Sequence, residues 1–191
     1  MQQVKFVHFS DLHLDCPFTS LGPDLERISQ RRKDLLDVFD NIIEITKREN
    51  ADLILISGDL YEHFYVKKST INHINNKFKE IGDKKVFIIP GNHDPYVNNS
   101  YYKSFQWNNN VYILSGERSK VELEDLNTCV YGLGFEDFYM DSSARDEIGT
   151  VNDERINILL VHGTVDMNFT NQRYNLLSSD ELSQLNMDYI A

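Results

Sequence analysis

The amino-acid sequence predicts an α/β fold built on a parallel sheet. Residues 4–9, 51–56 and 85–89 are rich in β-forming side chains, and the run 51–56 is almost continuously apolar, as expected for a strand covered on both faces. The two segments between these stretches repeat apolar residues every three or four positions, which is the helical period. The order β-α-β-α-β is that of right-handed parallel crossovers.

The spacing of apolar side chains justifies each of these elements. Residues 35–46 place one apolar stripe on a helix, and the strand 51–56 follows it. A second helix carries its stripe over 71–81, and the strand 85–89 stops at Pro90. We therefore expect three parallel strands joined by two helices.

Beyond this unit the pattern changes. Two short strand-like runs, 111–114 and 129–133, have no clear helix between them and predict a second, more antiparallel sheet packed on the first. Residues 136–155 are polar and acidic and are expected to form a surface excursion, whereas 156–161 is a further core strand. Residues 178–181 have the spacing of a capping box before a short helix.

The length and composition of the chain limit the functions that it can have. A chain of 191 residues without repeats or linkers fits one domain, and a net charge of −11 argues against tight DNA binding by this chain alone. Two bound divalent metals would add roughly +4 at the site, and a partner subunit could supply a basic groove. Cys16 and Cys129, without CxxC spacing, fit a reducing cytoplasm. With no visible signal peptide and no apolar run of about 20 residues, we expect a cytoplasmic protein outside the membrane.

Four short segments each end a strand-like run with residues suited to metals or phosphate. They contain, in chain order, Ser10-Asp11-Leu12-His13, Gly58-Asp59, Gly91-Asn92-His93-Asp94 and Val161-His162-Gly163. The carboxyl ends of parallel strands share one edge of a sheet, where open α/β folds place their chemistry. Carboxylate, imidazole and amide ligands without thiolate suit Mn, Fe or Zn. Two such ions held together could clamp the attacking and leaving oxygens of a phosphoryl displacement.

This series of motifs resembles the calcineurin-type metallophosphoesterase superfamily. The sequences that flank the first two motifs, residues 7–15 and 55–61, are similar to the nuclease branch of this superfamily, which contains SbcD and Mre11. They are most similar to YhaO-like DNA-repair exonucleases. The resemblance covers residues 4–191 and implies a four-layer α/β/β/α sandwich, two metal ions with Mn preferred, and an SbcC-like coiled-coil ATPase partner. It leaves a homodimer open.

One family motif, Gly-His-x-His, is absent from the sequence. Residues 187–191 read as a strand that simply stops, and in the family this motif follows such a strand. We therefore expect residues 1–191 to be a metallophosphoesterase domain incomplete at its C-terminus, and a longer gene to encode the motif within a few residues of Ala191.

The resemblance assigns a role to each motif residue. Asp11 and His13 alternate on an extended chain and would bind the first metal together. Asp59 would bridge both ions, because a carboxylate has two acceptor oxygens. Asn92 and His162 would bind the second metal. The plainer interpretations are a capping Asp with a surface His, a Gly-Asp turn, a Pro-Gly-Asn turn and a satisfied core His.

Two further residues would act on the phosphate or support that action. His93 would stay off the metals and serve as transition-state stabiliser or general acid to the leaving oxygen. Asp94 would orient that imidazole and favour its protonated form.

The other histidines carry weaker expectations. His8 is expected in the core or packed behind the site, His63 on the surface and His73 on the solvated face of its helix. The aromatic residues that follow the Asn-His motif are more consistent with core or subunit contacts than with base stacking; they are Tyr96, Tyr101, Tyr102, Phe105 and Trp107.

The sequence thus predicts a divalent-metal-dependent phosphoesterase that cleaves phosphodiester bonds, most consistent with a DNA exonuclease in repair. Another phosphoester substrate is an open alternative, namely a phosphoprotein, a cyclic nucleotide or a nucleotide pyrophosphate. A non-catalytic scaffold that has lost its site is the alternative from a different class.

Overall fold

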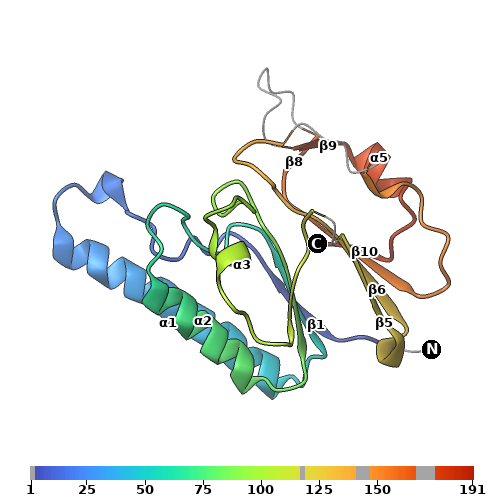
Figure 1. The fold of residues 1–191 in the computed structure, drawn as a ribbon, viewed down its shortest axis with the longest axis horizontal. Coiled ribbons are helices and arrows are strands. Elements are labelled where there is room, and N and C mark those ends of the chain that lie inside the picture. Colours follow the sequence, from blue (N-terminus) through green and yellow to red (C-terminus); the bar gives the residue numbers. More distant parts are fainter. Residues whose placement is uncertain (1–2, 117–118, 141–146, 167–174) are drawn as a thin grey trace.

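Two four-stranded sheets pack face to face in the computed structural model (Figure 1). The structure describes residues 3–116, 119–140, 147–166 and 175–191. Helices cover the outer face of the first sheet, and a short helix lies on the outer face of the second. The structure therefore has the α/β layers that the sequence predicts.

The first sheet is entirely parallel, with strand order β1-β2-β3-β4. Its strands are β1 (Phe6–Phe9), β2 (Leu53–Ser57), β3 (Lys85–Ile89) and β4 (Val111–Ile113). The first three confirm the predicted strands. The fourth corrects the prediction for 111–114, because Val86 to Ile88 of β3 pair with Val111 to Ile113 and draw this run into the first sheet.

Two long helices cover the outer face of this sheet. They are α1 (Leu25–Arg48) and α2 (Lys68–Glu80), and α1 begins where the Asp24 carboxylate accepts a hydrogen bond from the Arg27 amide. Their apolar stripes pack on the side chains of alternate strand residues; this first core cluster includes Phe39, Ile43, Ile54, Ile56, Ile74, Phe78 and Ile88. Shorter helical turns are η1 (Thr19–Leu21) and α3 (Tyr101–Ser104).

The second sheet has the order β10-β7-β6-β5 and is mixed. Its strands are β5 (Lys120–Leu123), β6 (Thr128–Leu133), β7 (Ile156–Val161) and β10 (Tyr189–Ile190). Only β5 and β6, joined by the turn η2 (Glu124–Leu126), are antiparallel; β6 pairs in parallel with β7, and β7 with β10. The sheet is thus less antiparallel than predicted, because β7 returns through a long crossover and runs in the direction of β6.

The inner faces of the two sheets form the second core cluster. Period-two alternation turns Leu53 and Leu55 toward the second sheet, while Ile54 and Ile56 face the helices. The cluster also contains Phe87, Ile89, Val130, Ile158 and Leu160. This packing holds the carboxyl ends of β2, β3 and β7 near one another.

The outer face of the second sheet packs on α5 (Ser179–Ser183) and on the short pair β8 (Thr164–Val165) and β9 (Leu176–Leu177). The N-cap residue Ser178 makes no side-chain capping bond, so the predicted capping box is not formed. Instead the Asp166 carboxylate accepts a hydrogen bond from the Ser179 amide at 2.9 Å.

The surface excursion predicted for 136–155 is only partly described, because 141–146 lie outside the described residues. At its far end Val151 is buried, and its amide donates to the Leu185 carbonyl at 2.9 Å. That part of the segment packs on the domain.

Two side-chain predictions on the helical side have clear outcomes. The aromatic residues after the Asn-His motif pack against the first core cluster, and Tyr102 belongs to its buried members. His73 is not simply solvated: its Nε2 lies 2.7 Å from the Asp40 carboxylate of α1, so it joins the two helices. Among the described residues, no helix is both long and apolar enough to cross a bilayer.

Candidate metal centre

The loops that follow β1, β2, β3 and β7 surround one cavity of about 680 Å³. The five expected metal ligands all line it: Asp11, His13, Asp59, Asn92 and His162. Ala191 lies on its wall as well. The cavity therefore sits at the edge that open α/β folds use for chemistry, with both sheets contributing to it.

The loop after β1 is not the extended chain expected from sequence. Asp11 and His13 have φ values of 56° and 46°, in the left-handed region that few non-glycine residues adopt. Backbone bonds hold this conformation, since the Asp11 amide donates to the Gly58 carbonyl at 3.2 Å and the His13 amide to the Asp59 carbonyl at 3.0 Å. The two side chains still meet, with His13 Nε2 lying 3.9 Å from Asp11 Oδ1. Such strain is common where a loop must aim functional groups.

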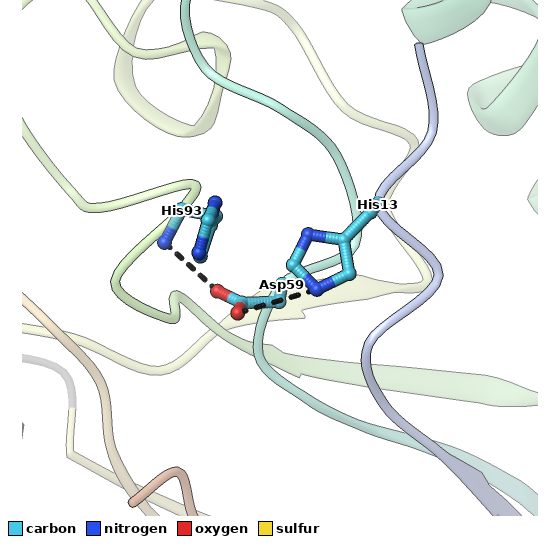
Figure 2. Close-up of side chains that lie close together, drawn as sticks. All are labelled: His13, Asp59 and His93. Carbon is cyan, nitrogen blue, oxygen red and sulfur yellow. Dashed lines mark hydrogen bonds and ion pairs between the residues drawn. The ribbon is translucent and has the colours of Figure 1, made fainter. Parts of the chain in front are cut away.

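Asp59 lies at the centre of the cavity. Its Oδ2 is 3.7 Å from His13 Nε2, and its Oδ1 accepts a hydrogen bond from the His93 amide at 2.9 Å (Figure 2). The same Oδ2 lies 3.4 Å from His162 Nε2. Burial raises the pKa of Asp59, but the hydrogen bond and charge of His162 outweigh it, so the pKa is lowered. This carboxylate is therefore ionised and faces imidazoles on both sides.

His162 is held by its backbone surroundings. Its Nδ1 donates to the Ser57 carbonyl at 2.8 Å, which turns Nε2 toward the cavity, 3.2 Å from Asn92 Oδ1. Burial lowers the pKa of His162, but the Asp59 hydrogen bond and charge outweigh it and raise the pKa to about 9. An imidazole whose Nδ1 is fixed by a carbonyl presents its Nε2 to a metal in the usual way.

Glu62 is a site residue that the sequence analysis missed. Its Oε1 accepts from His13 Nδ1 at 2.9 Å, and its Oε2 pairs with His93 Nδ1 at 3.2 Å. The two imidazole rings lie edge to face, with centroids 4.7 Å apart. The only signal in the sequence is an acidic residue three positions after Asp59.

Two groups of ligand atoms are close enough to hold a metal ion. One consists of His13, Asp59 and His93, the other of Asp11, Asp59 and His162, and within each group the ligand atoms lie within 4.8 Å of one another. Asp59 belongs to both groups. The geometric grouping differs from the expected one in two ways. Asp11 groups with His162 rather than with His13, and His93, which was expected to stay off the metals, supplies a ligand atom to the first group. Oxygen and imidazole donors fit a hard or borderline divalent ion.

Comparisons with known proteins agree with this geometry. A family model described as calcineurin-like phosphoesterase matches residues 4–190. The chain belongs to this family. Membership implies a metal-dependent hydrolase, and the oxygen and nitrogen donors around Asp59 fit that chemistry.

Individual relatives of this calcineurin-like phosphoesterase are distant. An uncharacterized metallophosphoesterase, YhaO of Bacillus subtilis, is 25% identical over 198 residues, which cover 100% of this chain and 48% of that protein. The DNA double-strand break repair protein Mre11 of Sulfolobus acidocaldarius is 26% identical over 165 residues, covering 83% of this chain and 41% of that protein. Mre11 of Saccharolobus solfataricus is 29% identical over 93 residues, covering 48% of this chain and 23% of that protein. The chain thus spans about half the length of the curated relatives it matches, or less.

Asp94 is placed differently from the expectation that it orients His93. It is fully buried, and its Oδ1 accepts hydrogen bonds from the amides of Asp59 at 3.0 Å and Gly91 at 2.7 Å. Its Oδ2 accepts from the Leu60 amide at 2.7 Å and the Tyr102 hydroxyl at 2.6 Å. These donors direct the carboxylate beneath the loops that carry Asp59 and Asn92.

Burial raises the pKa of Asp94 to about 6, with the Asp59 charge in the same direction and the Tyr102 hydrogen bond opposing. The carboxylate beside His93 is that of Glu62 instead. Asp94 therefore joins the loops that follow β2 and β3 through hydrogen bonds, and it affects the site by holding these loops in place.

Two other histidines of this phosphoesterase domain lie near the cavity. His8 is exposed rather than in the core: it lines the cavity, and its ring nitrogens contact Ser57 Oγ at 3.1 Å and the Tyr189 hydroxyl at 3.2 Å. His63 is half-buried rather than on the open surface, and its amide donates to the His93 carbonyl at 2.9 Å.

Proposed function

We propose that this domain hydrolyses phosphodiester bonds with two divalent ions, Mn being preferred, and acts on DNA ends as an exonuclease. The observation that carries the proposal is the position of Asp59, whose carboxylate belongs to both ligand groups. His93 lies beside it and is held by a second carboxylate, that of Glu62. Two adjacent ions are the arrangement suited to in-line phosphoryl displacement.

Each residue has a defined task in this proposal. Asp59, with Asp11, His13, Asn92 and His162, would hold the ions, which supply electrostatic stabilisation to the phosphoryl oxygens when bound. Glu62 accepts from Nδ1 of His93 and leaves Nε2 to donate a hydrogen bond or proton to the leaving oxygen.

DNA is the proposed substrate class because two of the relatives are DNA double-strand break repair proteins. The net charge of −11 means that phosphate contacts by this chain alone contribute little affinity. A coiled-coil ATPase partner remains a prediction from the resemblance, a homodimer remains an open possibility, and a cytoplasmic location remains a prediction from the cysteine usage and the sequence of residues 1–15.

The first test measures hydrolysis of bis(p-nitrophenyl) phosphate by this chain with added Mn²⁺. The Asp59→Asn variant should abolish activity. The matched control Asp83→Asn, an exposed carboxylate before β3 at the opposite end of the sheet, should leave it unchanged. Equal rates in all three proteins would overturn the proposal.

A second assay decides the substrate class. End-labelled DNA should release mononucleotides, whereas a phosphopeptide, a cyclic nucleotide and a nucleotide pyrophosphate should be hydrolysed poorly. Preference for one of those three would replace DNA as substrate. Absence of hydrolysis with every substrate would favour the scaffold alternative.

A further inference from the structure

An exposed cluster of aromatic rings stands beside the candidate metal centre. The rings of Phe64 and Phe138 are stacked, with centroids 5.2 Å apart and an interplanar angle of 7°. The His63 ring meets both edge to face, at 5.1 Å from Phe64 and 5.7 Å from Phe138. We call these three residues the aromatic shelf. Phe64 remains 75% exposed, which is unusual for a large apolar ring.

Phe64 and Phe138 of the aromatic shelf line a pocket that borders the cavity around Asp59. This pocket, of about 330 Å³, is lined by Glu62, Phe64, Asn92, His93, Phe138 and Tyr139. Asn92 and His93 also line the larger cavity around Asp59. A substrate whose phosphate lies at His93 could therefore place a neighbouring group on Phe64.

The backbone fixes the aromatic shelf relative to the catalytic loop. The His63 amide donates a hydrogen bond to the His93 carbonyl at 2.9 Å, and Phe64 is the next residue in the chain. The Val66 amide then donates to the Glu62 carbonyl at 2.8 Å and closes the turn that carries both rings. The His63 ring contributes an aromatic edge to both phenylalanine rings. The shelf is thus preorganised as a stacking surface.

The charge of the site favours an aromatic ligand over a purely ionic one. Among the described residues that line the two pockets there is neither a lysine nor an arginine, and the chain carries a net charge of −11. Affinity for the non-reacting part of a substrate must then come from uncharged contacts. Stacking on aromatic side chains is the usual source of such affinity for nucleobases, and it tolerates any base sequence.

We propose that the aromatic shelf binds the nucleobase adjacent to the scissile phosphodiester, in an unpaired DNA strand end. An unpaired base is required, because a base inside a duplex already has both faces stacked. This inference rests on the proposed phosphodiesterase function and names the feature that its substrate must have. It makes Phe64 a specificity-determining residue.

The kinetic test compares two chromogenic diesters that share a leaving group. The p-nitrophenyl ester of thymidine 5′-phosphate carries a base, and methyl p-nitrophenyl phosphate does not. Phe64→Ala should raise KM for the first about 5- to 150-fold, the equivalent of losing one stacked base, and leave the second unchanged. Phe64→Tyr should restore the native KM. Leu25→Ala is the matched control, since Leu25 is an equally exposed apolar residue on α1, at 78%.

A binding measurement keeps the inference separate from the proposed function. A short single-stranded oligonucleotide with a terminal 2-aminopurine is titrated in Ca²⁺, and stacking quenches its fluorescence. Native protein and Phe64→Tyr should quench, and Phe64→Ala should not. Quenching without hydrolysis of any diester would support the shelf while refuting the phosphodiesterase. Equal loss on both diesters, or quenching unaffected by Phe64→Ala, would overturn the base site.

Discussion

The carboxylate of Glu62 lies 3.2 Å from Nδ1 of His93, in the position that the sequence predicts for the carboxylate of Asp94. The same carboxylate uses its other oxygen for His13 Nδ1, at 2.9 Å. One side chain thus fixes both an imidazole of a ligand group and the imidazole proposed to act on the leaving oxygen. This double contact makes Glu62 a positioning residue for the whole site.

Replacement of Glu62 by Gln should lower kcat about 10- to 100-fold with a smaller change in KM. An amide keeps only one acceptor oxygen, so it can serve one of the two imidazoles but not both. The measurement is diester hydrolysis with saturating Mn²⁺, with Glu136→Gln, an exposed change, as the matched control. An unchanged kcat would show that His93 does not depend on this contact.

Asp94→Asn should act mainly on stability. The buried carboxylate accepts hydrogen bonds from the amides of Asp59, Leu60 and Gly91 and from the Tyr102 hydroxyl, and an amide NH₂ would face some of these donors. We expect the free energy of unfolding to fall by about 2–4 kcal/mol, against about 1 kcal/mol for Tyr102→Phe, which removes one donor.

Urea unfolding monitored by circular dichroism measures both changes. Full stability of Asp94→Asn combined with lost hydrolysis would instead support the catalytic role that the sequence suggested for this residue.

The strands β2 and β3 could be predicted because their apolar runs are long and continuous. The motifs that follow them, Gly58-Asp59 and Gly91-Asn92, therefore fell at the correct edge of the sheet. That these motifs lie close to His162 could be predicted as well, because parallel strands present their carboxyl ends at one edge of a sheet.

Other features depend on tertiary contacts that no local pattern records. The three-residue strand β4 is too short to carry a period, and its pairing with β3 decides which sheet it joins. The partner of His93 depends on how the loop after Asp59 folds back. The left-handed backbone at Asp11 depends on its bond to the Gly58 carbonyl.

Metal stoichiometry should distinguish the central ligand from a peripheral one. Asp59→Asn should reduce affinity for both Mn²⁺ ions, since Asp59 belongs to both ligand groups, whereas His162→Ala should weaken one. Equilibrium dialysis with elemental analysis of the protein counts the ions. Two ions retained by Asp59→Asn would contradict the shared position of this carboxylate. Asp83→Asn controls for the loss of one negative charge away from the site.

An ion-pair network in the second sheet should make the free energy of unfolding depend on pH in the acidic range. Arg155 lies 2.9 Å from a Glu122 oxygen and pairs with Asp153, and its hydrogen bonds lower the pKa of both carboxyls to about 2. Their contribution is present above the usual values of 4.5 and 3.8 and is lost as the pH falls toward 2. The urea midpoint should decline across this interval less steeply in Arg155→Gln. Parallel declines would show that the exposed network contributes nothing measurable.

Gly58 should be irreplaceable for a reason that Gly82 does not share. Both have positive φ, 86° and 65°, but a Cβ on Gly58 would lie 2.7 Å from the His162 ring, while a Cβ on Gly82 would meet nothing within 4 Å. Each alanine variant should lose about 1 kcal/mol of stability from the backbone alone. Gly58→Ala should in addition displace His162 and lower Mn²⁺ affinity and diester hydrolysis, while Gly82→Ala keeps both. Equal activity of the two variants, measured at matched folded fractions, would show that the close approach of Gly58 to His162 is not needed to aim the imidazole at the metal centre.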